Sequence, residues 1–140
     1  PYEVLIVASI IEREVRREED RAKVARVIYN RLDKDRKLEL DSTVTYAKKL
    51  KTTTTTKKDR KSKSKYNTYR YKGLPPGPIS GPGKDALEAA ANPEKGKWLY
   101  FVTVNLDTGE TKFAENLADF EKIRLEFQTW CQSNPGRCES

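Results

Sequence analysis

The alternation of hydrophobic and polar positions predicts that the chain opens with a pair of helices. Residues 2–17 are apolar on nearly every side in their first half, which is typical of a buried central helix. Residues 20–34 repeat apolar side chains at i, i+4 spacing, and Asp20 is placed to cap this second helix. A short third helix follows, ending near Lys49, with cap-type side chains at Asp41, Ser42 and Thr43.

The second half of the chain changes character at a segment rich in glycine and proline. Residues 66–83 include five Gly and Pro between positions 73 and 78, so we expect a rigid extended loop there. The pattern then predicts a helix at 84–91, a strand at 98–104, its hairpin partner at 111–113 and a helix at 117–130 capped by Asn116. Helices, loop, hairpin and helix in this order indicate a single α+β domain over 1–140.

Composition narrows the chemistry that this domain can perform. The 140 residues are 35% charged and 36% hydrophobic, and they contain two Cys, no Met and no His. Without imidazole, Ser-His-Asp hydrolysis, Cys-His proteolysis and HExxH zinc sites are excluded, so acid-base chemistry must use carboxylates, Lys, Tyr or Cys. No apolar run is long enough to span a bilayer. The absence of Met and the start inside an apolar run indicate a piece of a longer protein.

The net charge of +7 comes from one segment. Residues 48–65 hold nine Lys and Arg against Asp59 alone, a net charge of +8, which leaves −1 for the rest of the chain. This low-complexity stretch of Thr, Ser and Lys has no apolar periodicity, so we expect a mobile basic loop. A nucleic-acid partner is disfavoured because no aromatic residue is interleaved with these lysines.

A carboxylate falls inside the apolar face of the first helix. At about 100° per residue, Glu12 lies between Ala8 and Leu5, so burial would keep it protonated for use as a general acid. Glu14 lies at the other edge of the apolar arc and is the weaker candidate. The structural alternative is a helix-edge ion pair between Glu12 and Arg16, one turn further along.

Five segments in this order resemble one enzyme family: ASIIERE (8–14), LDSTVTYA (40–47), YNTYRYKGLPPGPISGPG (66–83), LEAAANPEKGKWLYFV (87–102) and FAENLADFEK (113–122). The chain is similar to the YceG-like, MltG-type endolytic murein transglycosylases. The resemblance implies non-hydrolytic cleavage of the β-1,4 bond between N-acetylmuramic acid and N-acetylglucosamine, which leaves a 1,6-anhydromuramic end. The family's catalytic glutamate matches Glu12, and no cofactor or metal is implied.

The resemblance also implies residues that bind the sugar. Hydroxyls and amides on a rigid loop can stabilise an oxocarbenium-like transition state, and the candidates are Tyr66, Asn67, Thr68 and Tyr69. Each of these could instead cap a turn or line the edge of the core. A matching segment expected to line the cleft contains Asp41, Ser42 and Thr43, which could equally be helix caps.

Cys131 and Cys138 flank QSNPGR, whose Asn-Pro-Gly can turn the chain back, so a local disulfide is geometrically easy. Such a bond persists outside the cytosol, and two free thiols are the alternative. By resemblance, the native protein is expected to carry an N-terminal transmembrane helix and a LysM-like domain, to face the outer side of a bacterial membrane, and to work beside peptidoglycan synthases. The remaining alternatives are a hydrolytic muramidase and a peptidoglycan-binding module without catalysis.

Overall fold

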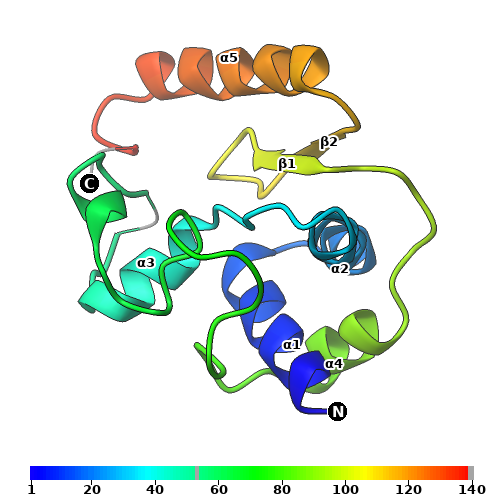
Figure 1. Ribbon diagram of the computed structural model, residues 1–140. Helices are drawn as coiled ribbons and strands as arrows, with labels where there is room; N and C mark the ends of the chain where they lie inside the picture. Colours follow the sequence, from blue (N-terminus) through cyan, green and yellow to red (C-terminus); the bar gives the residue numbers. More distant parts are fainter. Residues whose placement is uncertain (53, 139–140) are drawn as a thin grey trace.

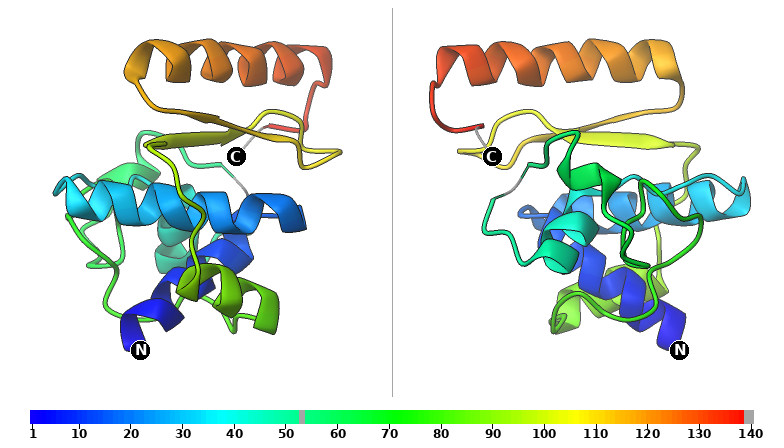
Figure 2. Two further views of the ribbon diagram at one scale, coloured as in Figure 1. Left: turned by 90° about the vertical axis from the view of Figure 1, so that its right-hand side faces the viewer. Right: turned by 60° about the vertical axis from the view of Figure 1, so that its left-hand side comes forward.

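The computed structural model, which describes residues 1–52 and 54–138, arranges the chain in layers (Figure 1). The elements are α1 (Tyr2–Glu14), α2 (Glu18–Asp33), α3 (Asp41–Lys48), a 3-10 helix (Asp59–Lys61), α4 (Lys84–Ala91), β1 (Tyr100–Thr103), β2 (Thr111–Ala114) and α5 (Leu117–Ser133). The two strands lie between α5 on one side and α2 on the other, and α1, α3 and α4 form the helical body beyond α2 (Figure 2). The predicted α+β class is confirmed.

Helix α1 lies at the centre of the helical body because most of its length is apolar. It packs against α2, α3 and α4, and every residue from Ile6 to Ile11 is buried. Burial of a side chain such as Ile10 stabilises the fold by roughly 1.5–3 kcal/mol. The buried stretch ends before the last turn of α1, where Glu12 and Arg13 are exposed and Glu14 is half-buried.

The hairpin and α5 form a separate layer. The strands pair in antiparallel register from Tyr100↔Ala114 to Thr103↔Thr111. The ring of Tyr100 stacks on Phe120 of α5 with 4.6 Å between centroids, and Asn116 caps α5, as predicted, by accepting a 2.9 Å hydrogen bond from the backbone N–H of Asp119. A disulfide joins Cys131 to Cys138 at the end of this helix.

Two predicted helix caps are wrong. Helix α2 begins at Glu18 with Arg17 as the N-cap residue, so Asp20 lies buried in the first turn, where negative charge suits the helix dipole. Helix α3 begins after Leu40, and no side chain caps it. Asp41 instead accepts hydrogen bonds from Thr55 and Tyr69, and the hydroxyl of Thr43 donates to the carbonyl of Leu40.

The basic segment 48–65 contains more local structure than its composition suggested. It includes the 3-10 helix, and Thr55 is buried. Asp59 accepts hydrogen bonds from the backbone N–H of Thr56 (3.0 Å) and from Lys48 Nζ (2.9 Å), which lower the pKa of its carboxyl group to about 2. The mobility of this segment stays a prediction.

Among residues 1–52 and 54–138, none of the helices has the length and apolar character needed to cross a bilayer.

Candidate active site

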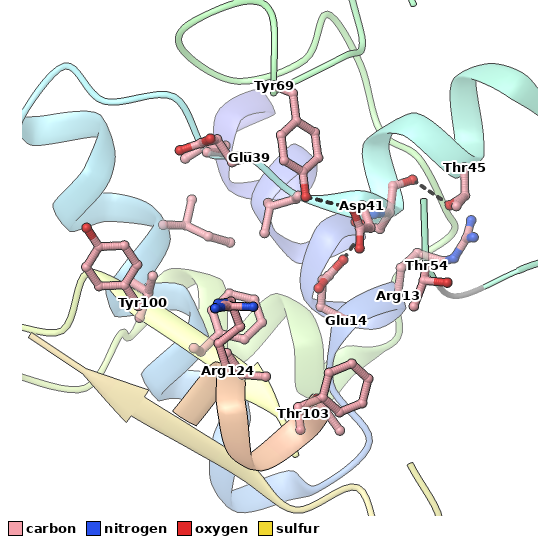
Figure 3. A pocket seen from close by; sticks show the side chains of 18 of the residues that line it. Arg13, Glu14, Glu39, Asp41, Thr45, Thr54, Tyr69, Tyr100, Thr103 and Arg124 are labelled. Carbon is pink, nitrogen blue, oxygen red and sulfur yellow. Dashed lines mark hydrogen bonds between the residues drawn. The ribbon is translucent and has the colours of Figure 1, made fainter. Parts of the chain in front are cut away.

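A pocket of about 640 Å³ opens between the helical body and the hairpin layer (Figure 3). Its polar end is formed by the last turn of α1 and the first turn of α3, where Glu14 and Asp41 lie close together. Its opposite wall comes from β1 and α5, which contribute Tyr100 and Arg124. Two carboxylates at one end, with aromatic rings and the guanidinium of Arg124 at the other, give a concave site of the kind that binds small ligands.

Glu14 is the carboxylate that this pocket surrounds. Its Oε2 accepts a 3.3 Å hydrogen bond from the backbone N–H of Ser42. Burial raises the pKa of Glu14, and the negative charge of Asp41 raises it further, while hydrogen bonding by Ser42 and the positive charge of Arg13 act in the opposite direction. The net shift is upward, so Glu14 keeps its proton to higher pH than an exposed glutamate does, and a general acid needs its protonated form.

Asp41 is held in place by three groups from two other segments. Its Oδ1 accepts hydrogen bonds from the hydroxyls of Thr55 (2.6 Å) and Tyr69 (2.7 Å), and Arg60 Nε lies 3.7 Å away. Burial and then the charge of Asp41 raise the pKa of Tyr69, so its phenol stays protonated and continues to donate. The basic segment thus reaches the site through Thr55 and Arg60, and it fixes the carboxylate that faces Glu14.

Glu12, the predicted catalytic residue, lies outside the pocket. Its side chain is exposed, and its Oε1 accepts a 2.8 Å hydrogen bond from the backbone N–H of Gly83. The expectation that Glu12 is buried is wrong because apolar neighbours on a helical wheel enclose a residue only while the helix remains inside the core. The alternative ion pair is also absent among the described residues, since Arg16 donates instead to the carbonyl of Leu106.

Four of the predicted sugar-binding residues lie at the start of α3 or in the loop at 66–83, and the side chains of three of them are closed off from the pocket. Asn67 is fully buried; its Nδ2 donates to the carbonyls of Arg60 and Ser62, both at 2.8 Å. Thr43 and Thr68 are buried and share a 2.8 Å hydroxyl–hydroxyl hydrogen bond. As placed, these three side chains cannot reach a ligand, so they support the site instead of lining it. Ser42 does line the pocket.

The two predicted tyrosines point to different places. Tyr69 lines the pocket beside Asp41, whereas Tyr66 lines a smaller neighbouring pocket with Tyr46. We did not predict Tyr46 from the sequence, nor the wall formed by Tyr100, Phe120 and Arg124. Those wall residues belong to the hairpin layer, which packs against α2 through tertiary contacts, and nothing local in the sequence indicates which of their faces lines the pocket.

The described residues offer no arrangement for a metal ion, since no group of three or more Cys, Asp or Glu side chains gathers there in a way that could hold one.

Comparison with known proteins gives consistent matches. The YceG-like family model matches residues 1–125. The endolytic murein transglycosylase of Bacillus subtilis is 39% identical over 126 residues, which are 90% of this chain and 34% of that protein. The enzymes of the same name from two Streptococcus pneumoniae strains, D39 and R6, are each 34% identical over 125 residues, which are 86% of this chain and 22% of theirs.

A solved structure is similar as well. The crystal structure of a yceG-like protein from Listeria monocytogenes matches with a TM-score of 0.82 and 45% identity, over 87% of this chain and 39% of that chain. The chain therefore spans 22–34% of the length of the curated relatives, so the comparison concerns one region of them.

Proposed function

Because the chain belongs to the YceG-like family, we propose that it is the catalytic part of an endolytic murein transglycosylase that cleaves glycan strands of peptidoglycan without water. The observation that carries the proposal is the half-buried carboxyl of Glu14 in the pocket between the layers, with a raised pKa. We assign the acid-base role to Glu14 in place of Glu12, whose side chain points to solvent beside Gly83.

The proposed reaction needs one carboxyl group that acts twice. Protonated Glu14 donates its proton to the glycosidic oxygen as the bond from that oxygen to the anomeric carbon of the muramic residue breaks. The resulting carboxylate then takes the proton of the C6 hydroxyl of the same sugar, and that oxygen bonds to the anomeric carbon. Glu14 ends as it began, protonated, and the products are a 1,6-anhydro end and a free 4-hydroxyl group.

A hydrolytic muramidase is the second candidate, because Asp41 places a second carboxylate beside Glu14. Ordinary glycosidases use two carboxyl groups, one as the acid and one as the base or nucleophile. The transglycosylase is favoured because Asp41 Oδ1 already accepts hydrogen bonds from Thr55 and Tyr69. These bonds stabilise the carboxylate where it lies and reduce its nucleophilicity.

Product analysis separates the two candidates. Purified peptidoglycan is digested with the 140-residue chain, and the released muropeptides are weighed by mass spectrometry. We expect muramic ends lighter by one water than the reducing ends that a muramidase would leave. Reducing ends as the main product would support the muramidase, and intact strands would support a binding module.

We expect Asp41→Asn to shift the pH dependence of cleavage to lower pH. The charge of Asp41 raises the pKa of Glu14, so its removal lowers that pKa. The general acid must be protonated, so activity is lost as pH rises through the pKa of Glu14. The alkaline limb of the pH–rate profile should therefore lie at lower pH in the variant. Initial rates of anhydro-end formation from pH 4 to 9 measure the shift. An unmoved limb would show that Asp41 does not act on the reacting acid.

Two wider features of the resemblance stay proposals. Membrane attachment through a segment outside this chain, on the outer side of a bacterial membrane, would place Glu14 next to newly made strands. Association with peptidoglycan synthases would let the enzyme trim or terminate those strands.

A further inference from the structure

A second pocket of about 490 Å³ adjoins the Glu14 pocket. The two pockets share Arg13, Thr45 and Leu50, so they meet at the last turn of α1 and the end of α3. Figure 3 shows Arg13 beside Thr45, on the opposite side of Glu14 from Tyr100 and Arg124. We call this second cavity the Arg13 pocket. A glycan strand held by both cavities would therefore pass Arg13, the chain neighbour of Glu14, where the cavities meet.

Two tyrosines form an aromatic wall in the Arg13 pocket. The rings of Tyr46 and Tyr66 are 5.1 Å apart between centroids and inclined by 43°, and Tyr46 is 40% exposed. A tyrosine at such a site offers an apolar ring face and a polar hydroxyl. A pyranose ring has matching features, with C–H groups on its faces and hydroxyls around its rim. The pair is thus suited to hold a sugar ring.

The charges around the Arg13 pocket are all of one sign. Arg13 and Lys49 line it, and no described residue that lines it is acidic. This contrasts with the Glu14 pocket, which contains Glu14, Glu39 and Asp41. The charge of Arg13 acts on Glu14, but within the described part of the chain neither Arg13 nor Lys49 donates a side-chain hydrogen bond or lies within ion-pair distance of a carboxylate. Their donors are therefore available to an anionic ligand, and a guanidinium can bind a carboxylate through two parallel hydrogen bonds.

We propose that the Arg13 pocket is a subsite for a carboxylate-bearing sugar residue of the glycan strand, adjacent to the bond at Glu14. The choice of ligand rests on the proposed function. Tyr46 and Tyr66 hold the sugar ring, and Arg13 and Lys49 bind the carboxylate. That carboxylate is carried either by the sugar's own lactyl group or by its peptide stem. In this arrangement Arg13 sets the register of the strand, because it lies one residue from the reacting acid.

The test measures binding in a Glu14→Gln background, which removes turnover. Isothermal titration compares three ligands of equal length: strands stripped of peptides, strands with stems and neutral chitin oligosaccharides. We expect Arg13→Gln and Lys49→Gln each to weaken binding of the carboxylated strands roughly tenfold, the loss of one charge-assisted contact, and to change chitin binding less than about twofold. Tyr46→Ala should weaken binding of all three ligands.

Two controls complete the design. Lys34→Gln removes an exposed charge that lines neither pocket and should leave all affinities unchanged. Arg13→Lys keeps the charge and should recover part of the loss. A loss confined to stem-bearing strands would identify the stem as the source of the carboxylate, and a loss that includes stripped strands would identify the lactyl group.

Unchanged binding of carboxylated strands by Arg13→Gln would overturn the subsite. So would equal losses of affinity for chitin and for carboxylated strands in that variant, or an equal effect of Lys34→Gln. Because binding is measured without cleavage, this result is independent of the test of function. If the wild-type chain forms no anhydro ends and the binding pattern holds, the proposed reaction fails and the subsite stands. If anhydro ends form and the pattern is absent, the subsite alone fails.

Discussion

Glu14→Gln is expected to lower the rate of anhydro-end formation by roughly 10²- to 10⁴-fold, the range for removal of a positioned general acid. The amide cannot give a proton to the glycosidic oxygen or take one from the C6 hydroxyl. Its carbonyl can still accept the backbone N–H of Ser42, which now binds Glu14 Oε2 at 3.3 Å. The variant should therefore keep the site's geometry, and it should bind glycan strands with wild-type affinity while releasing almost no product.

The stability of the same variant offers an internal check on the environment of Glu14. Because burial raises the pKa of Glu14 in the folded chain, the folded state holds the proton more tightly than the unfolded state does. Its contribution to stability is present at low pH and is lost as pH rises through the raised pKa. Above that pH, Glu14→Gln should unfold at the same temperature as the wild type or higher. A lower unfolding temperature would contradict the burial of this carboxyl.

Asn67→Ala is expected to destabilise the fold by roughly 3–5 kcal/mol, because a fully buried amide makes three hydrogen bonds to backbone groups. Besides the carbonyls of Arg60 and Ser62, it binds the backbone N–H of Tyr69 at 3.0 Å. Alanine would leave these groups buried without partners and free the segment that carries Arg60 and Tyr69. Cleavage should fall with stability, and urea unfolding followed by circular dichroism measures the free-energy change.

Asn92→Ala is the matched control for this substitution. Asn92 is exposed at the end of α4, and its amide makes one 3.3 Å hydrogen bond to the carbonyl of Glu88. Its replacement should change the free energy of unfolding by no more than about 0.5 kcal/mol. If Asn67→Ala costs no more than Asn92→Ala, the buried amide does not hold the 60–69 segment together.

The pattern of apolar, capping and turn residues predicted most of the secondary structure, because these signals act within a few residues of one another along the chain. The helix at 84–91 has the predicted bounds, and Asn116 caps the last helix as its spacing indicated. The caps at Asp20 and Asp41 were wrong because three acidic residues begin α2 one turn early, and because Asp41 has partners from distant segments. Cap propensity cannot rank such competing partners.

The site was harder to predict than the fold, and the first helix shows the reason. A helical wheel gives the angular positions of Glu12 and Glu14 around the axis of α1. It does not show where along that axis the helix leaves the core. That point lies before the last turn. Glu12 therefore faces solvent near Gly83, while α3 and the hairpin layer enclose Glu14. The segments that enclose Glu14 lie about 30 to 110 residues away along the chain. Tertiary packing brings them to α1, and the hydrophobic periodicity of α1 holds no information about that packing.

The most direct test of the account compares Glu12→Gln with Glu14→Gln in one assay. The two substitutions make the same chemical change two residues apart on the same helix turn, and anhydro ends released from purified peptidoglycan are counted by mass spectrometry. We expect near wild-type release by Glu12→Gln and almost none by Glu14→Gln. Loss of release in Glu12→Gln together with retained release in Glu14→Gln would contradict it and return the catalytic role to Glu12.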